Sequence, residues 1–175
     1  EAQRLVALIA DIIRLSQLDE GVEMPKENVE LMSLAGEVAE DLRAAADKAS
    51  VTITTDGQSS IVFGVRRLLY EMLYNLCDNA IKYNRPGGSV RIHVENREQE
   101  AAISVLDTGI GIAPEHQSRI FERFYRVDKS HSKASGGTGL GLSIVKHAVQ
   151  LHRGTIALQS EPGKGTCIRV CFPAK

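Results

Sequence analysis

Between residues 136 and 143 the sequence reads Gly-Gly-Thr-Gly-Leu-Gly-Leu-Ser, and apolar residues then recur at helical spacing up to Leu151. Glycine lets the backbone approach a ligand closely. The first turn of a helix presents free N–H groups and the positive end of the helix dipole. This combination is typical of a phosphate-binding turn. The alternative is a glycine-rich turn that serves only to begin the helix.

A second polar pattern lies on the helix predicted over residues 65–83. A stripe of polar residues recurs there at helical spacing: Glu71, Asn75, Asp78, Asn79 and Lys82. Asparagine is a middling helix former that favours caps, so two asparagines one turn apart indicate carbonyl oxygens directed at a ligand. Oxygen ligands suit Mg²⁺, which binds through one or two protein oxygens together with phosphates. The alternative is an ordinary solvated helix face.

The strand predicted over residues 101–107 ends in an acid, Asp107, which two glycines follow at Gly109 and Gly111. The carboxylate has two interpretations. In the first it accepts hydrogen bonds from backbone N–H groups and starts a turn. In the second it accepts hydrogen bonds from a ligand amine, and the glycines leave room for a flat ring.

Residues 121–126 read Phe-Glu-Arg-Phe-Tyr-Arg, with two phenylalanines and two arginines at a spacing of three. We expect Phe121 and Phe124 to anchor a lid. Arg126 has the planar, fork-shaped donor set that suits a phosphate. The alternative is an amphipathic turn with solvated arginines.

The elements that must hold these residues follow from the hydrophobic periodicity. Helices are predicted over residues 1–19, 34–49, 65–83 and 139–152, with a short one after Pro114. Strands are predicted within residues 29–34, 51–55, 61–63, 89–95, 101–107, 155–160 and 166–172, with a turn at Asp56-Gly57. This irregular alternation favours an α+β fold, a two-layer α/β sandwich whose mixed sheet is covered on one face by helices.

The first predicted helix has an unusually wide apolar stripe that includes Leu5, Leu8, Ile12 and Leu15. A helix with so much apolar surface suits a bundle or a dimer. The alternative is a terminal helix that lies on its own domain. The chain begins at Glu1 within this pattern, without a methionine, and we expect it to be part of a longer protein.

The composition is that of a globular protein, with 175 residues, 43% hydrophobic and 25% charged. With a formal net charge of −1, the chain does not have the excess of basic residues that is typical of nucleic-acid-binding domains, so we expect no nucleic-acid partner. No apolar run approaches the roughly 20 residues that a membrane span needs, so we expect no membrane contact by this segment. We expect the three cysteines, Cys77, Cys167 and Cys171, to be small core residues. The five histidines have no metal-binding spacing.

Taken in order, these segments resemble the ATP-binding catalytic domain of two-component sensor histidine kinases of the phosphate-regulon-sensor type. This superfamily includes DNA gyrase B, mismatch-repair ATPases and heat-shock chaperone ATPases. Residues 71–83 resemble the family's N box, residues 107–112 its first glycine box and residues 121–126 its F box. Residues 137–141 resemble the second glycine box and residues 163–166 a third. The resemblance covers essentially the whole chain and implies the Bergerat-type ATP-binding fold.

The resemblance implies that the substrate is ATP, and it assigns the base to one group of residues. Asp107 would accept a hydrogen bond from the exocyclic amine of adenine, with Thr166 nearby through water. Tyr83 would pack beside the adenine. The base pocket would be shaped by Gly109, Gly111 and Ile112.

A second group would hold the phosphates and the metal. Asn75 would ligate Mg²⁺, Asn79 and Lys82 would contact phosphates, and Arg126 would approach the γ-phosphate. Glu71 would orient water or the phosphate acceptor. Backbone amides at the start of the last helix would hold phosphates, within the segment Gly137, Thr138, Gly139, Leu140 and Gly141.

The resemblance also implies partners that lie outside this sequence. The enzyme would be a protein-histidine kinase that transfers the γ-phosphoryl group to a histidine on a dimeric helical hairpin of the same protein, forming a homodimer. A response-regulator aspartate would receive the phosphate next. None of the five histidines lies in an H-[DE]-x-x-[NT]-P context, so we expect the acceptor before residue 1.

Residues 8–20 resemble the end of the second helix of that hairpin. This resemblance predicts the hairpin's end at residues 1–20, a linker at 21–26 and the ATP-binding domain at 27–175, with an ATP lid at about 113–137. The family implies a cytoplasmic domain of a membrane-anchored sensor. The alternative function is an ATP-responsive conformational module without kinase activity.

Overall fold

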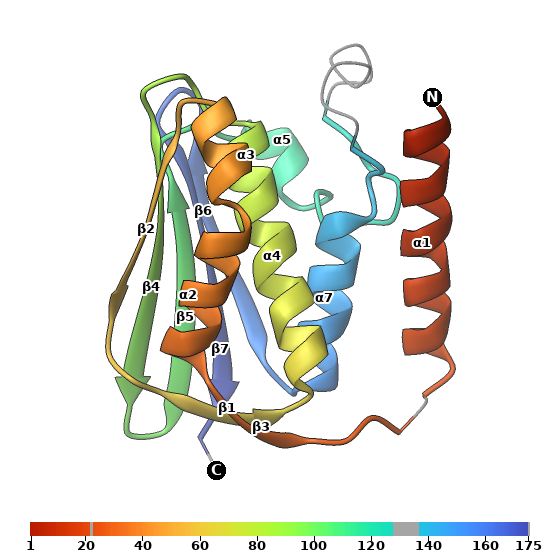
Figure 1. Cartoon of the computed structure of the whole chain (residues 1–175), viewed down its shortest axis with the longest axis vertical. Coiled ribbons are helices and arrows are strands. Elements are labelled where there is room, and N and C mark those ends of the chain that lie inside the picture. The colour runs from red at the N-terminus through yellow and green to blue at the C-terminus, as the bar shows by residue number, and fades with distance from the viewer. Residues whose placement is uncertain (22, 128–136, 175) are drawn as a thin grey trace.

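A computed structural model describes residues 1–21, 23–127 and 137–174, and these residues form two main layers (Figure 1). One layer is a five-stranded mixed sheet in the order β2-β4-β5-β7-β6. Its strands are β2 (Thr52–Gly57), β4 (Ser89–Arg97), β5 (Glu100–Asp107), β6 (Thr155–Glu161) and β7 (Gly165–Pro173). β2 runs parallel to β4, and the other pairs are antiparallel.

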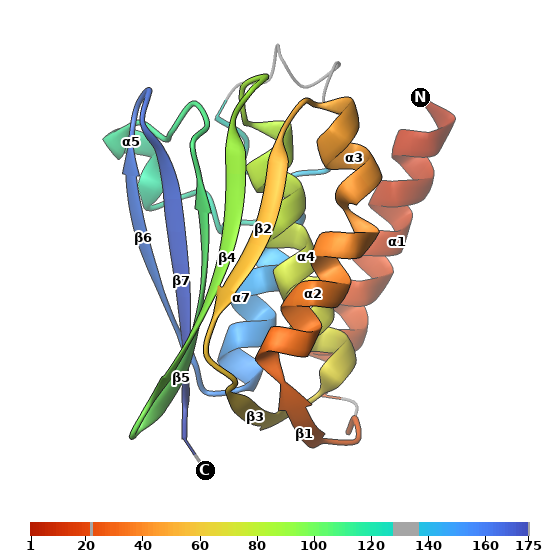
Figure 2. The same cartoon turned by 60° about the vertical axis from the view of Figure 1, so that its left-hand side comes forward.

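The second layer consists of helices that cover one face of this sheet and leave the other face open (Figure 2). The helices are α1 (Ala2–Asp19), α2 (Leu31–Asp41), α3 (Arg43–Lys48), α4 (Arg66–Lys82), α5 (Pro114–Gln117) and α7 (Gly141–Leu151). A small antiparallel sheet of β1 (Glu27–Glu30) and β3 (Ile61–Gly64) lies at one end. The predicted α+β fold with a mixed sheet covered on one face is therefore confirmed.

The core lies between the layers, where the two hydrophobic periodicities meet. On β4, Val90, Ile92 and Val94 are fully buried and alternate with polar residues, as period 2 requires. On α4, Leu69, Met72, Leu73, Leu76 and Cys77 are almost completely buried along one helical face. The helix predicted over residues 65–83 and the strand predicted within 89–95 are confirmed.

The predicted turn at Asp56-Gly57 is wrong, because both residues belong to β2. Gly57 pairs with Val94 of β4 and has a φ of +123°. A Cβ atom on Gly57 would lie 2.0 Å from the carbonyl oxygen of Val94. The glycine is therefore explained by the close approach of two strands, which the sequence does not distinguish from a turn.

The predicted helix over residues 34–49 is divided into α2 and α3 at Leu42, although helical hydrogen bonds continue through that residue. α2 begins earlier than predicted because Glu30 caps it. The Glu30 carboxylate accepts hydrogen bonds from the backbone N–H groups of Met32 and Ser33, at 3.1 and 2.7 Å. Partial burial alone would raise the pKa of Glu30, but the hydrogen bonds from Ser33, Met32 and Ser60 outweigh it and lower the pKa to about 2.

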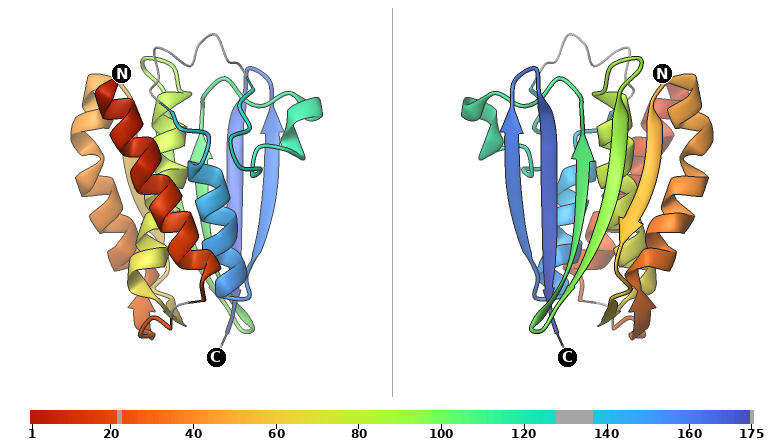
Figure 3. Two further views of the ribbon diagram at one scale, coloured as in Figure 1. Left: turned by 90° about the vertical axis from the view of Figure 1, so that its right-hand side faces the viewer. Right: turned by 90° about the vertical axis from the view of Figure 1, so that its left-hand side faces the viewer.

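α1 lies across the outer side of the helix layer, over α4 and α7 (Figure 3, left). Leu15 and Leu18 are buried, and Leu15 packs with Leu140 and Ile144 at the start of α7. The opposite side of α1 is exposed at Leu5, Val6, Ile9, Ile12 and Ile13. The wide stripe thus docks on its own domain along one side only. No helix among the described residues is long and apolar enough to cross a membrane.

The cysteines divide between the core and the open face of the sheet. Cys77 is buried within α4, and burial raises the pKa of its thiol. Cys167 and Cys171 are half-buried on β7, where they alternate with the buried Ile168 and Val170. The core placement predicted from the sequence is therefore correct for Cys77 and wrong for the other two, because period 2 puts them on the other face.

Candidate functional site

Three polar side chains form a row across the end of the sheet. Asp107 on β5 pairs with Thr166 on β7, and Thr166 pairs with Ser160 on β6. Two residues away along β5 and β7, Val105 and Ile168 are buried in the core. Because alternate residues share a face, all three polar side chains lie on the helix-covered face of the sheet. We call Asp107, Thr166 and Ser160 the strand-end row.

Asp107 directs one of its two carboxylate oxygens at the protein. Oδ1 accepts the backbone N–H of Gly109 at 2.8 Å and that of Thr166 at 3.3 Å. Both hydrogen bonds use Oδ1. No hydrogen bond between described residues involves Oδ2, so this oxygen is available to a ligand donor. Burial raises the pKa of the carboxyl and outweighs the opposing effect of the two hydrogen bonds. A donor placed at Oδ2 would stabilise the ionised form of this half-buried group.

The segment after Asp107 folds against the end of α4. The backbone N–H of Ile110 donates to the carbonyl oxygen of Tyr83 at 3.0 Å. A Cβ atom on Gly109 would lie 2.4 Å from that same oxygen, so only glycine fits without displacing the backbone. Gly111 follows with a φ of +71°. Tyr83 itself is 45% exposed, so its ring borders the site without being enclosed.

The polar stripe of α4 is half-buried rather than solvated, since Glu71, Asn75 and Asn79 all have intermediate exposure. Asn75 Nδ2 donates to the carbonyl oxygen of Glu71 at 2.9 Å, which fixes the amide plane. Lys82 forms an ion pair with Asp78, one turn back on α4, at 2.8 Å. The stripe therefore combines a fixed amide with a partly neutralised cation.

The segment from Gly137 to Gly141, which we call the α7 turn, faces this stripe. A Cβ atom on Gly141 would lie 3.2 Å from Asn75 Oδ1, so the amide oxygen is directed at the start of α7. Leu140 donates its N–H to Thr138 Oγ1 at 3.2 Å. The turn thereby brings a helix N-terminus, with its free backbone N–H groups, beside an amide oxygen.

Arg126 approaches the α7 turn from the F-box segment. A Cβ atom on Gly137 would lie 3.3 Å from Arg126 Nη2 and 4.0 Å from the hydroxyl of Tyr83. The N–H of Phe124 donates to the carbonyl oxygen of Gly139 at 2.9 Å. Phe124 is 57% exposed, so it does not anchor the segment through burial as predicted, whereas Phe121 does pack against the core. Residues 128–136 of the predicted lid, including Gly136, lie outside the described residues.

α1 contacts the same group of residues. Thr138 Oγ1 donates to Asp11 at 2.8 Å, and Arg14 forms an ion pair with Glu71 at 3.7 Å. Arg123 donates to both oxygens of Asp19, at 3.1 and 2.9 Å. α1 therefore adds two carboxylates and a guanidinium to the edge of the candidate site.

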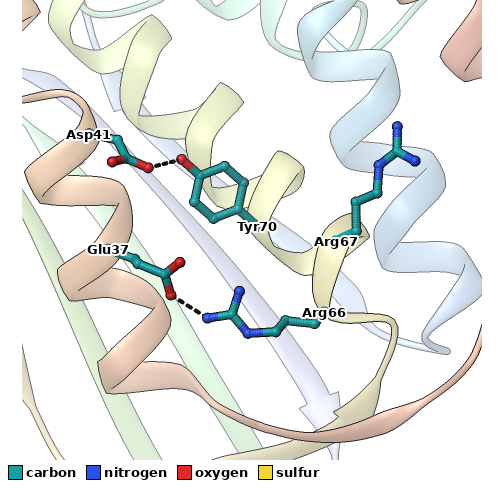
Figure 4. A pocket seen from close by; sticks show the side chains of 5 residues that line it. All are labelled: Glu37, Asp41, Arg66, Arg67 and Tyr70. Carbon is teal, nitrogen blue, oxygen red and sulfur yellow. Dashed lines mark hydrogen bonds and ion pairs between the residues drawn. The ribbon is translucent and has the colours of Figure 1, made fainter.

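Two cavities lie in different parts of the domain. A shallow cavity of about 370 Å³ is lined by the strand-end row together with its strand neighbours Leu106, Gln159 and Cys167, which alternate onto the other face of the sheet. Another, of about 450 Å³, lies between α2 and α4 (Figure 4). Its polar groups pair with one another, Arg66 with Glu37 and Tyr70 with Asp41. The second cavity contains none of the predicted site residues.

Two residues of this neighbourhood were not predicted from the sequence. Ser160 belongs to the strand-end row, and Gln117 on α5 donates to the carbonyl oxygens of Ile112 and Ser160 at 2.9 and 3.1 Å. The alternation with Ile156 and Leu158 on β6 predicts the face on which Ser160 lies, but not that it belongs to a site. Gln117 has no sequence signal, since its role depends on where α5 docks.

Comparison with known proteins identifies the family of this domain. A family model described as histidine kinase-, DNA gyrase B-, and HSP90-like ATPase matches residues 64–175. The chain belongs to this family of ATP-binding domains. The family resemblance and the fold predicted from the sequence are confirmed.

Relatives that match this chain are named as sensor histidine kinases, as is one of the two solved structures reported below. The chain is 43% identical to the sensor-like histidine kinase SenX3 of Mycobacterium tuberculosis and 39% identical to the sensor histidine kinase RppB of Synechocystis, each over 99% of this chain. It spans 43% and 39% of those two proteins. The mycobacterial sensor histidine kinase MprB matches 85% of this chain and 97% of its own, with a TM-score of 0.75 and 27% identity. Full-length ShkA in complex with AMPPNP matches 97% of this chain and 35% of its own, with a TM-score of 0.85 and 27% identity.

Proposed function

We propose that this domain binds ATP with Mg²⁺ and transfers the γ-phosphoryl group to a histidine elsewhere in the same protein. The observation that carries the proposal is the arrangement of three groups: an acceptor at the end of β5 (Asp107), an amide oxygen on α4 (Asn75) and, facing that oxygen, the N-terminus of α7. Full-length ShkA, which shares this fold, was solved in complex with AMPPNP, and this supports a nucleotide as the ligand.

The base lies, in this proposal, against the strand-end row. Asp107 Oδ2 accepts a hydrogen bond from the exocyclic amine of adenine, with Thr166 nearby through water. Gly109, Gly111 and Ile112 form the wall that the flat ring contacts. Tyr83, at the end of α4, packs beside the ring. The support is the carboxylate oxygen of Asp107 that the two backbone N–H groups leave unused.

The phosphates extend towards the α7 turn. Backbone N–H groups around Gly139–Gly141 hold phosphate oxygens at the positive end of α7. Asn79 contributes an amide, and Arg126 contributes a guanidinium that approaches the γ-phosphate. Lys82 contributes a cation when its ammonium group leaves the ion pair with Asp78 and binds phosphate. The support is the position of Arg126 beside Gly137 and the half-burial of Asn79.

The residues at this end also fit Mg²⁺. Asn75 Oδ1 is the ligand, because Nδ2 is held by Glu71 and the oxygen faces the start of α7. Mg²⁺ takes one or two protein oxygens together with phosphate oxygens and water, which a single asparagine beside a phosphate turn satisfies. When bound, the metal supplies charge neutralisation across the phosphates.

Positioning and electrostatic stabilisation then account for most of the chemistry. Arg126 stabilises negative charge on the transferred group. Glu71 orients the acceptor, and its ion pairs with Arg14 and Arg67 hold the carboxylate in place. The acceptor is a histidine on a dimerisation hairpin, and a response-regulator aspartate receives the phosphate afterwards. α1 is, in this proposal, the end of that hairpin's second helix, followed by a linker at residues 21–26.

Incubation of the full-length protein with Mg²⁺ and γ-labelled ATP tests this function. We expect acid-labile, alkali-stable phosphate on the protein and its loss in the Asn75→Ala variant. Asn28→Ala is a matched control, because Asn28 lies in the small sheet of β1 and β3. ATP binding without any transferred phosphate would refute kinase activity and favour the ATP-responsive conformational module.

A further inference from the structure

Tyr125 and Arg126 are neighbours in the F-box segment, but their side chains contact different elements. A Cβ atom on Gly137 would lie 3.3 Å from Arg126 Nη2, and one on Gly139 would lie 3.3 Å from Arg126 Cγ. The hydroxyl of Tyr125 forms a hydrogen bond with Nδ1 of His116 on α5. Arg126 therefore lies along the α7 turn, whereas the side chain of Tyr125 is bound to the segment that contains α5.

The half-buried ring of Tyr125 is held by two side chains of that segment. The rings of His116 and Tyr125 lie 6.0 Å apart at an angle of 44°. The guanidinium of Arg119 lies 4.4 Å from the centre of the Tyr125 ring, within the range of a cation–π contact. Glu122 accepts two hydrogen bonds from this guanidinium at 3.3 Å, which keeps Arg119 in place. We call His116, Arg119 and Tyr125 the tyrosine clamp.

The tyrosine clamp is anchored to the main sheet. Gln117 follows His116 on α5 and donates to the carbonyl oxygens of Ile112 and Ser160, at 2.9 and 3.1 Å. Ser160 belongs to β6, so these bonds fix α5 to the end of that strand. The position of Tyr125 is therefore set by the sheet through α5.

The backbone adopts an unusual conformation at Phe124, immediately before Tyr125. Its φ of +64° lies in the left-handed region, which residues other than glycine rarely adopt. Such a conformation persists only where the surrounding contacts determine it. The side chain of Phe124 is 57% exposed, so the constraint comes from its N–H, which donates to Gly139 at 2.9 Å, and from the tyrosine clamp that follows. Loss of the clamp would free the backbone that carries Arg126.

We propose that Tyr125 is a positioning residue for Arg126, because the tyrosine clamp fixes the F-box backbone where the guanidinium can reach the γ-phosphate of ATP. The inference rests on the proposed function. A guanidinium that is already in place loses less conformational freedom when it binds phosphate. Loss of the clamp leaves the strand-end row and the α7 turn intact, so it weakens the interaction with the γ-phosphate and not the binding of the rest of the nucleotide.

Calorimetric titration of the full-length protein with ADP and with AMPPNP tests this inference, because only AMPPNP carries a γ-phosphate. We expect Tyr125→Ala to lower the affinity for AMPPNP about tenfold and to leave that for ADP nearly unchanged, as the loss of a hydrogen bond to a charged group would. Tyr125→Phe keeps the ring at Arg119 and loses only the bond to His116, so it should have a smaller effect of the same kind. Tyr70→Phe is the matched control, because it removes a hydrogen bond to Asp41 outside the candidate site.

A double variant distinguishes positioning of Arg126 from a general structural role. If Tyr125 acts through Arg126, Tyr125→Ala should not change the ratio of the two affinities further once Arg126 has been replaced by alanine. A further fall in that ratio would overturn the inference. An unchanged ratio in Tyr125→Ala alone, or an equal loss of both affinities, would also overturn it. If urea unfolding shows that Tyr125→Ala does not fold, Tyr125→Phe replaces it in the same comparison.

Failure of the inference can be told apart from failure of the proposed function. An unchanged ratio in Arg126→Ala would refute the role of Arg126 at the γ-phosphate and with it this inference, while binding of ADP would leave the nucleotide site in place. A wild-type protein that binds neither nucleotide refutes the proposed function itself.

Discussion

Replacing Asp107 with asparagine should weaken adenine nucleotide binding without unfolding the domain. The new amide can keep its oxygen towards the N–H groups of Gly109 and Thr166, which both bind Oδ1 in the wild type. Its NH₂ group then lies where Oδ2 was, and it faces the amine of adenine as a second donor. The lost bond is charge-assisted and contributes roughly 1.5–3 kcal/mol. This corresponds to a loss of affinity of roughly 10- to 150-fold.

The stability of the folded domain should not fall with this substitution. Burial raises the pKa of Asp107 in the folded state, so the folded protein binds the proton more tightly than the unfolded chain does. That contribution to stability is fully present only below the unfolded pKa and is lost as the pH rises through the folded value. At neutral pH the ionised carboxylate is a cost, which a neutral amide removes.

Calorimetric titration with ADP and ATP measures the affinity, and urea unfolding at pH 7.5 measures the stability. Asp56→Asn is the matched control, because Asp56 is the last residue but one of β2 and its carboxylate pairs with Arg91 and His93. Unchanged nucleotide affinity in Asp107→Asn would refute the assignment of Asp107 to the base. A fall in affinity that accompanies lost cooperativity of unfolding would show that the residue is structural.

Three further perturbations test other parts of the structure. Asn75→Ala should abolish Mg²⁺-dependent turnover but reduce metal-free nucleotide binding much less. If nucleotide affinity falls equally in titrations with Mg²⁺ and with EDTA, Asn75 is structural. Buried His152 accepts the N–H of Val65 at 2.9 Å, and burial lowers its pKa, so folding should weaken as the pH falls below about 6.5. Urea midpoints of wild type and His152→Gln should therefore converge between pH 7.5 and 5.5, and parallel profiles would contradict this. Glu30→Ala removes the cap of α2 and should cost about 1–2 kcal/mol in urea unfolding, with Glu23→Ala expected to change little.

The fold was predictable where periodicity alone decides the element. β4 alternates cleanly, and α4 has a continuous apolar face, so the type and position of both elements were predicted correctly. The pairing of strands was not predictable to the same degree. Gly57 looks like a turn residue in the sequence, but it marks the contact of two strands, β2 and β4, that are joined through β3 and α4. Tertiary contact rather than local propensity determines its role.

The candidate site also contains residues that local sequence patterns identified and residues that they did not. Asp107 and Asn75 were identified because an acid that ends an apolar strand and an asparagine within a helix are locally unfavourable choices. Ser160 satisfies every local rule for a strand, so nothing in its own segment indicates a site. The contacts of α1 with Thr138 and Glu71 depend on how a distant helix docks, which no local pattern determines.

The strand-end row also links ligand binding to the last steps of folding. Asp107 and Thr166 are 59 residues apart in the chain, and their hydrogen bond forms only after the β6–β7 hairpin joins β5. Contacts of such long range form late, because the entropy of closing the intervening loop is lost first. If the base binds the strand-end row as proposed, a chain without a docked hairpin offers it no binding edge, and nucleotide would bind only molecules that have completed the sheet. At a concentration 100 times its Kd, a ligand of this kind stabilises the complete fold by about 2.7 kcal/mol, which protects the C-terminal hairpin from opening and proteolysis.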